Sequence, residues 1–185
     1  MSDLFFASSN RHKFEEAREI LAQFGLRLRF FRYSLEEIQS EDLSEIARHK
    51  ALQACMQCPG PVIVEDAGLF IDSLNGFPGP YSSFVFDTIG NRGILKLVSS
   101  KRAATFRSII AYCEKNHDVM VFEARVKGKI SRKLQGRRWG FDPIFIPEGR
   151  SKTYSQISDK NSVSHRFRAL EKFASWYLRR LQSTG

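Results

Sequence analysis

The sequence predicts an α/β fold, because a strand, a helix and a second strand follow one another at its start. Residues 4–8 form a short apolar run that ends in small polar residues, as in a buried strand leading into a turn. Asn10 is a good N-cap, apolar residues recur at helical spacing over residues 14–24, and Gly25 ends the helix. Residues 26–31 then alternate like a second strand. Such a unit favours parallel strand pairing.

The middle of the chain continues this alternation of elements. An amphipathic helix is expected over residues 43–56, and a buried strand over residues 62–64 carries Glu65 and Asp66 at its end. A dense Gly/Pro turn covers residues 75–80. The remaining expected elements are helices at 84–89 and 94–98, strands at 105–113 and 119–126 joined by a hairpin loop at 115–118, a strand at 144–146, and a final amphipathic helix at 164–181.

Composition favours one folded domain. The 185 residues are 42% hydrophobic and 26% charged, which is enough for one core and close to the globular average. We therefore expect residues 1–185 to form a single domain, with the Gly/Pro turn separating two lobes. The N-terminus does not resemble a targeting segment, and no apolar run approaches the ~20 residues that span a bilayer. A cytoplasmic protein without membrane association is expected.

The three cysteines are expected to be reduced thiols, because an odd number in a chain without a secretion signal argues against a disulfide framework. Cys55 and Cys58 have the C-x-x-C spacing, but they close a predicted helix and precede Pro-Gly-Pro. A redox motif instead opens a helix after a strand. The sequence has no second cysteine pair to complete a zinc site.

The net charge of +9 favours an anionic partner. A basic nucleic-acid-binding module is one interpretation. However, the cations are mostly scattered, which is typical of a solvated surface, and no recognised nucleic-acid motif is present. A nucleotide substrate would also benefit from a positive field, so we expect no specific nucleic-acid partner.

Four short segments carry side chains that suit a nucleotide and a metal ion. In the first, a strand ending in Ser8-Ser9-Asn10 presents free N–H groups at the start of a helix, where phosphate binds readily. Lys13 adds a cation on the first helical turn, although the segment is not a Walker A loop. An ordinary N-capped helix is the alternative interpretation.

The second segment is the acid pair Glu65-Asp66. Ligands in α/β sheets usually lie at strand ends, where these carboxylates would suit Mg²⁺ and one could take a proton from water. Another acid cluster consists of Glu36, Glu37, Glu41 and Asp42, and one member is a candidate second metal ligand. In both places the alternative is a group of solvated acids in a loop.

The third segment, Trp139-Gly140-Phe141-Asp142-Pro143, offers aromatic faces for a base, and Asp142 could accept from a purine N1–H. A core turn with buried aromatic rings is the alternative. In the fourth, which runs from Lys160 to Arg166, Lys160 could reach phosphate, while His165 and Arg166 could donate to a base carbonyl. A capped, charged helix start is the alternative there.

Taken in order, these segments resemble the inosine triphosphate pyrophosphatase family over nearly the whole chain. The segments that carry the resemblance are Val64-Glu65-Asp66-Ala67-Gly68-Leu69, Leu74-Asn75-Gly76-Phe77-Pro78-Gly79-Pro80-Tyr81-Ser82, Gly140-Phe141-Asp142-Pro143-Ile144-Phe145 and Lys160-Asn161-Ser162-Val163-Ser164-His165-Arg166. The resemblance implies a long mixed central sheet flanked by helices, two lobes with the active-site cleft between them, and a homodimer. It also implies Mg²⁺-dependent hydrolysis of ITP, dITP and XTP to the monophosphate and pyrophosphate.

The resemblance also implies roles for individual residues. Asp66 is the general base and a metal ligand, and Glu37 is a second metal ligand. The substrate-binding residues it implies are Ser8, Ser9, Asn10, Arg11, His12, Lys13 and Lys50 for the phosphates, Ala67 as a further contact, Trp139, Gly140, Phe141 and Asp142 for the base, Lys160 as a second phosphate lysine, and His165 and Arg166 as base readers.

Two positions depart from the family pattern. Ser9 replaces a usual glycine, where a positive φ would be strained, and Ser83 stands where some members have a lysine. The expected selectivity follows from hydrogen bonding. Hypoxanthine and xanthine present an O6 acceptor and an N1–H donor, which Arg166 and Asp142 would satisfy, whereas adenine inverts both groups. A related pyrophosphatase acting on modified pyrimidine nucleotides is a further alternative.

Overall fold

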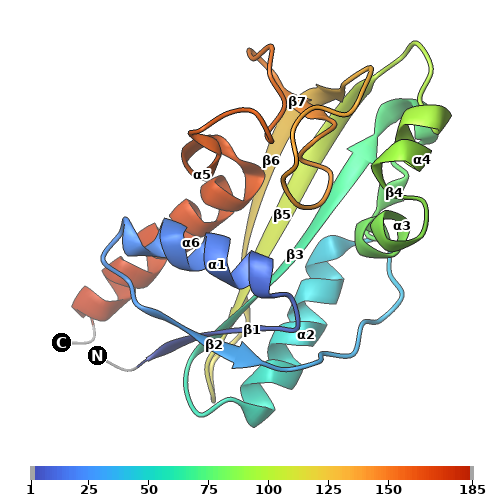
Figure 1. Cartoon of the computed structure of the whole chain (residues 1–185). Coiled ribbons are helices and arrows are strands. Elements are labelled where there is room, and N and C mark those ends of the chain that lie inside the picture. The colour runs from blue at the N-terminus through green and yellow to red at the C-terminus, as the bar shows by residue number, and fades with distance from the viewer. Residues whose placement is uncertain (1–2, 184–185) are drawn as a thin grey trace. The chain divides into compact units, whose positions relative to one another are not determined.

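The structure, a computed structural model that describes residues 3–183, is built on a mixed sheet of seven strands flanked by helices (Figure 1). The strands follow the order β2-β1-β3-β5-β6-β7, and β4 pairs with β3. Their bounds are Leu4–Ser8 (β1), Leu28–Arg32 (β2), Val62–Ile71 (β3), Pro78–Gly79 (β4), Ala103–Cys113 (β5), Met120–Ile130 (β6) and Phe145–Pro147 (β7). The predicted α/β class and the mixed sheet are confirmed.

The helices come in chain order between and after these strands. Their bounds are Arg11–Ala22 (α1), Leu43–Gln57 (α2), Ser82–Thr88 (α3), Gly90–Leu97 (α4), Lys160–Val163 (α5) and His165–Ser183 (α6), with a short 3₁₀ turn at Asp72–Leu74 (η1). Within the described residues, no helix is both long and apolar enough to cross a bilayer.

The chain divides into two compact units. The first contains the residues up to Asp66, Ser108–Ala124, and the residues from Arg166 onward. The second contains Ala67–Arg107 and Arg125–His165. Strands β3, β5 and β6 therefore contribute residues to both units.

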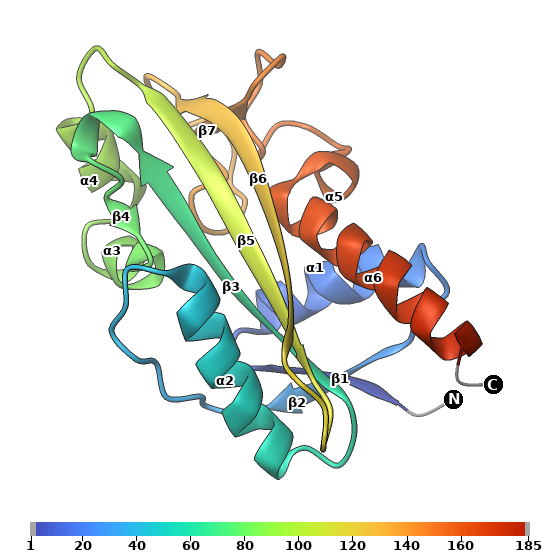
Figure 2. The same cartoon turned by 180° about the vertical axis from the view of Figure 1, so that it is seen from behind.

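The first unit contains the predicted strand–helix–strand start. β1 pairs in parallel with β2, from Leu4 opposite Leu28 to Ser8 opposite Arg32, and on its other side with β3. The side chain of Asn10 caps α1 by accepting a hydrogen bond from the main-chain N–H of Lys13. Helices α1 and α6 lie on one face of these strands (Figure 1), and α2 lies on the other (Figure 2).

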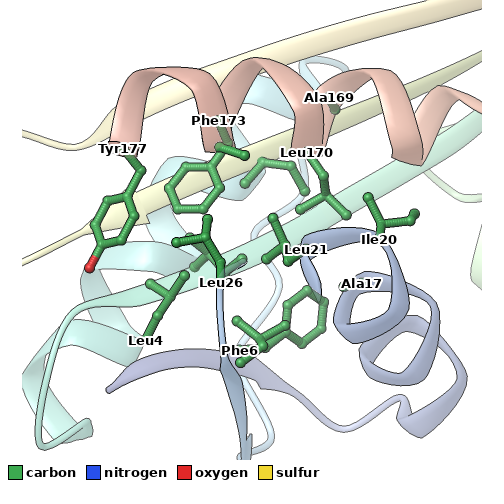
Figure 3. Close-up of a cluster of buried hydrophobic side chains, with 14 of the residues drawn as sticks. Leu4, Phe6, Ala17, Ile20, Leu21, Leu26, Ala169, Leu170, Phe173 and Tyr177 are labelled. Carbon is green, nitrogen blue, oxygen red and sulfur yellow. The ribbon is translucent and has the colours of Figure 1, made fainter. Parts of the chain in front are cut away.

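A hydrophobic core holds α1 and α6 against the strands of the first unit (Figure 3). Phe6 of β1, Leu21 of α1, and Leu170 and Phe173 of α6 are fully buried within it. The apolar stripe predicted for the final helix thus packs against the stripe predicted for the first. Burial of this apolar surface is the main stabilising force in the unit.

The second unit has a separate core, to which Leu69, Ile94, Phe106 and Tyr154 contribute. Its β3–β4 pairing depends on Gly68, because a Cβ atom there would lie 2.4 Å from the carbonyl oxygen of Gly79. The hydroxyl of Ser82, at the start of α3, donates to that same carbonyl at 2.7 Å. The predicted turn segment therefore fixes α3 beside β3.

One expectation about β3 was wrong. The strand was expected to stop at Val64 and leave Glu65 and Asp66 at its end, but it continues to Ile71 with both acids buried. The usual reason to end a buried strand at a carboxylate is the cost of removing its charge from water. Here nearby cations offset that cost, as described below.

Other differences are smaller. β2 begins at Leu28 and not at residue 26, β5 and β6 are longer than predicted, and β7 begins at Phe145. Residues 160–163, for which no helix was expected, form α5. Asn10, Gly25 and the hairpin between β5 and β6 are as predicted.

The three cysteines are free and buried, as expected for reduced thiols. Cys58 is the C-terminal cap of α2, so the C-x-x-C pair closes a helix. Burial raises the pKa of the Cys58 thiol, and it raises the pKa of the Cys113 thiol to about 12. Such thiols react poorly, which does not favour a redox role.

Replacing Phe173 by alanine tests the core of the first unit. Since Phe173 is fully buried, the variant should lose about 3–5 kcal/mol in the free energy of unfolding, measured by urea denaturation. Phe84, which is 68% exposed, supplies the matched control, and its alanine variant should stay within about 0.5 kcal/mol of the wild type. Equal losses in the two variants would contradict the core assignment.

Candidate active site

The loop between β1 and α1 is stabilised by hydrogen bonds between its own residues and the first turn of the helix. The main-chain N–H of Asn10 donates to the Ser8 hydroxyl at 3.0 Å, and that of Lys13 donates to the Asn10 side chain at 3.2 Å. Among the described non-glycine residues only Asn75 and Asn116 have positive φ, so Ser9 is not strained by replacing a glycine. The N-terminal end of α1 is thus a capped helix start that Ser9 fits without the strain expected from replacing a glycine.

Of the three cationic side chains that follow this loop, Lys13 is directed toward β3. Its ammonium donates to the main-chain carbonyl of Glu65 at 3.4 Å. Arg11 instead forms an exposed ion pair with Glu15 at 3.3 Å, and His12 is exposed. The structure therefore brings Lys13, and not Arg11, to the acid pair of β3.

The two acids of β3 belong to different faces of the sheet. Successive side chains of a strand point to opposite sides. Accordingly, Asp66 contacts Lys50 of α2, whereas Glu65 contacts Arg166 of α6. Glu65 and Asp66 therefore contact different helices, although they are adjacent in the sequence.

On the α2 side, Lys50 bridges two carboxylates. Its Nζ atom lies 2.8 Å from Asp66 Oδ2 and 3.2 Å from Glu37 Oε2. Burial tends to lower the pKa of Lys50, but Asp66 and Glu37 outweigh it, and the pKa lies above its ordinary value. The Lys50 ammonium is thus held in its charged form between the two proposed metal ligands.

Of the acids at residues 36–42, Glu37 is the candidate metal ligand that this arrangement favours. Glu36 contributes its main-chain N–H to Gln53, and Asp42 caps α2. Glu37 forms an ion pair with Lys50, which also contacts Asp66. Sequence alone left Glu36, Glu37 and Glu41 open as the second metal ligand.

The donors suit a divalent cation. Over residues 3–183 no three His, Cys, Asp or Glu side chains gather as a metal-binding group. However, Mg²⁺ is commonly held by only one or two carboxylates together with substrate phosphates. Glu37 and Asp66 already share one cation, the Lys50 ammonium, which stands in for the charge that such an ion would bring.

On the α1 and α6 side, Glu65 and Arg166 form a buried ion pair. Arg166 Nε lies 2.8 Å and 2.9 Å from the two carboxylate oxygens of Glu65, and its guanidinium also contacts Glu16 of α1. The Ser108 hydroxyl of β5 donates to Glu65 at 2.9 Å. Burial alone would raise the pKa of Glu65, but Arg166 and Lys13 lower it below its ordinary value.

In the second unit, Asp142 and Lys160 form another buried pair, with Lys160 Nζ 2.6 Å from Asp142 Oδ2. The Lys160 side chain is only 1% exposed. The short helix α5, which sequence periodicity did not reveal, presents this lysine. The phosphate contact expected for Lys160 would have to be made in addition to the ion pair.

The aromatic segment beside Asp142 has two different rings. Phe141 is buried in the core of the second unit and meets Phe86 edge-on, whereas Trp139 is partly exposed. The carbonyl of Gly140 accepts from the Asn91 side chain at 3.0 Å. His165 stacks on Phe106 with ring centroids 4.3 Å apart. Trp139 is therefore the more accessible of the two rings.

Sequence reasoning missed several residues that support these groups. The polar ones are Glu16, Ser108 and Asn91, and the aromatic one is Phe86. Ser108 was detectable in principle, as a hydroxyl inside an otherwise apolar strand, because such a group must find a partner. The other three lie on ordinary helical patterns and give no such signal.

A mixed sheet with lysines and carboxylates grouped along β3 defines an α/β protein whose charged groups suit a phosphorylated substrate. The chain belongs to the Ham1 family, whose model matches residues 4–176. The dITP/XTP pyrophosphatase of Methanopyrus kandleri is 45% identical over 179 residues, which cover 94% of this chain and 95% of the relative. The dITP/XTP pyrophosphatase of Methanothermobacter marburgensis is 47% identical over 177 residues, covering 93% and 94%.

Solved structures agree with this membership. The Ham1 protein of Staphylococcus aureus superposes with a TM-score of 0.81 at 26% identity, covering 97% of this chain and all of that one. A HAM1 protein from Coxiella burnetii gives the same TM-score and coverage at 28% identity. The predicted family resemblance is confirmed.

The buried Glu65 carboxylate should make stability depend on pH. Because its pKa in the folded state lies below the ordinary 4.5, Glu65 adds stability above that value, and this contribution is lost as the pH falls through the folded-state pKa. Glu65→Gln should therefore lower the free energy of unfolding by about 3 kcal/mol at neutral pH, since one member of a buried pair is removed.

Urea denaturation of both proteins across the acidic range checks this expectation. The gap between wild type and Glu65→Gln should shrink below pH ~4.5, while Glu15→Gln, at a surface ion pair, should change stability little. If the difference in the free energy of unfolding stays constant with pH, the charge of Glu65 is not the source of its stabilising effect.

Proposed function

We propose that this protein is a nucleoside triphosphate pyrophosphatase that acts on non-standard purine nucleotides such as dITP, XTP and ITP. It would cleave the bond between the α- and β-phosphates and release the monophosphate and pyrophosphate. The observation that carries the proposal is the grouping of Lys13, Lys50 and Asp66 around the middle of β3. Relatives named dITP/XTP pyrophosphatases, matched over more than nine tenths of the chain, support it.

Asp66 and Glu37 would hold the metal, which we propose to be Mg²⁺ because both are hard oxygen donors. When bound, Mg²⁺ would neutralise phosphate charge and make a nearby water more acidic. Asp66 would accept the proton of the attacking water, because its buried carboxylate shares its contact with Lys50 with the other proposed metal ligand, Glu37. Lys50 would stabilise the charge of Asp66 before substrate arrives.

The phosphates would contact the loop at Ser8, Ser9 and Asn10 and the first turn of α1. Main-chain N–H groups and the positive end of the helix dipole favour anions there. Lys13 adds a full positive charge, and its ammonium already lies beside β3 at Glu65. Arg11, His12 and Ala67 remain predicted contacts.

For the base, we propose that Trp139 supplies a stacking face and that Asp142 accepts from N1–H. Asp142 is paired with Lys160, and a carboxylate in an ion pair retains lone pairs for a further donor. His165 and Arg166 remain the proposed donors to O6. Adenine lacks N1–H, so it would not make this hydrogen bond to Asp142, and a hydrogen bond lost at a buried site costs ~1–3 kcal/mol.

The family resemblance also leads us to propose a homodimer in the cytoplasm. Light scattering coupled to size-exclusion chromatography tests the oligomeric state. The activity itself is tested by phosphate release in the presence of added inorganic pyrophosphatase, across dITP, XTP, ITP, ATP, dTTP and UTP. Turnover confined to the first three supports the proposal, whereas preferential turnover of pyrimidine nucleotides would favour the related pyrimidine-directed activity.

Asp66→Asn should abolish turnover while the protein still folds. The variant lacks both the proposed base and a metal-binding charge, so kcat should fall at least ~10²-fold at saturating Mg²⁺. Circular dichroism would confirm the fold, and Asp72→Asn, at an exposed acid of η1, would serve as the control. A kcat near that of the wild type would remove Asp66 from this role.

Lys13→Ala should weaken binding of a triphosphate more than binding of the monophosphate product. Lys13 is proposed to contact the β- or γ-phosphate, which the product lacks. Calorimetry with ITP in the presence of Ca²⁺, and with IMP, would measure both affinities. Arg18→Ala, which changes a cation on the same helix, should affect neither. Equal losses for the two ligands would contradict the proposed placement of Lys13.

A further inference from the structure

We infer that Lys50 is an internal counter-ion that competes with the divalent metal for Asp66 and Glu37, so that metal binds well only together with the nucleotide. The inference rests on the proposed function, in which these two acids are the metal ligands. It goes beyond that function by assigning Lys50 to the control of metal affinity.

The geometry of Lys50 supports this role. Its ammonium lies within hydrogen-bonding distance of Asp66 and within 3.2 Å of Glu37, two acids that come from different parts of the chain. The side chains of Lys50 and Asp66 are 12% and 6% exposed, so water screens their attraction only weakly. Lys50 is therefore a cation that the two acids share.

A metal ion that bound alone would meet this ammonium. Mg²⁺ requires oxygen ligands at about 2.0–2.1 Å, so it would compete with Lys50 for the same carboxylate oxygens. Two cations beside the buried Asp66 carboxylate would also repel each other. Displacing the ammonium without giving it another partner would leave a buried charge unpaired, which is costly.

A triphosphate removes this obstacle because it brings negative charge of its own. Its oxygens offer the displaced ammonium a new partner, and the carboxylates become available to the metal. Only the Lys50 side chain needs to move, since α2 is anchored by its buried residues Ile46, Ala47 and Ala51 and capped by Asp42. Metal and nucleotide would then assist each other's binding, as linkage requires.

Direct measurement of Mn²⁺ binding in the absence of nucleotide tests the inference. Electron paramagnetic resonance titrations of wild type, Lys50→Met and Lys50→Arg report free Mn²⁺ without relying on activity. Lys50→Met should bind Mn²⁺ at least ~10-fold more tightly than wild type, a coupling of ordinary size. Lys50→Arg should not bind Mn²⁺ more tightly than the wild type does, because a guanidinium can contact both carboxylates. Lys96→Met, at an exposed lysine of α4, is the control for loss of one charge.

Two outcomes would overturn the inference and leave the proposed function untouched. One is equal or weaker Mn²⁺ binding by Lys50→Met than by wild type. The other, which holds even if Lys50→Met does not fold, is a gain in affinity in Lys50→Arg. The double variant Asp66→Asn, Lys50→Met separates this failure from failure of the proposed metal site. If removing Asp66 does not lower the affinity of Lys50→Met, then Asp66 is not a metal ligand, and the proposed function loses its metal site as well.

Discussion

The buried ion pair between Glu65 and Arg166 is the constraint on which the first unit depends. A carboxylate in the middle of a buried strand is costly unless a cation and hydrogen-bond donors compensate it. Arg166, Ser108 and Lys13 provide that compensation from α6, β5 and α1. Because the compensation is complete on this face, β3 can continue through two acidic residues, and Asp66 is delivered to the opposite face.

Because successive side chains of β3 point to opposite faces of the sheet, the two acids have different environments. Glu65 is bound by a permanent arginine, and its charge serves the packing of α1 and α6 against the sheet. Asp66 is bound by a lysine, whose single flexible ammonium can leave more readily than a guanidinium held by three oxygens. A carboxylate that holds the helices to the sheet and the carboxylate proposed as the base can therefore be adjacent in the sequence and still have different partners.

The sequence revealed the elements that follow from local signals. The Asn10 cap, the Gly25 stop and the apolar stripe of α6 were confirmed because periodicity and capping are properties of neighbouring residues. The length of β3 was predicted wrongly because its extension depends on Arg166, which lies 101 positions away. Helix α5 was missed for a different reason, because four residues are too few for helical periodicity to be visible.

The same limit applies to the site. The four segments and their residue types were visible in the sequence, and the family resemblance followed from them. The partners were not visible: nothing local shows that Lys50 joins Glu37 to Asp66, or that Lys160 is paired with Asp142. Ion pairs of this kind depend on how distant segments meet, and the residues next to each partner in the sequence do not indicate them.

The two compact units are interleaved along the chain, the first in three segments and the second in two. No single cut of the polypeptide can release either unit whole, since β3, β5 and β6 each pass from one to the other. Neither unit is therefore available as a movable module for gene fusion or recombination. A change of specificity in such a chain would have to arise by substitution within its own segments, and not by exchange of a domain.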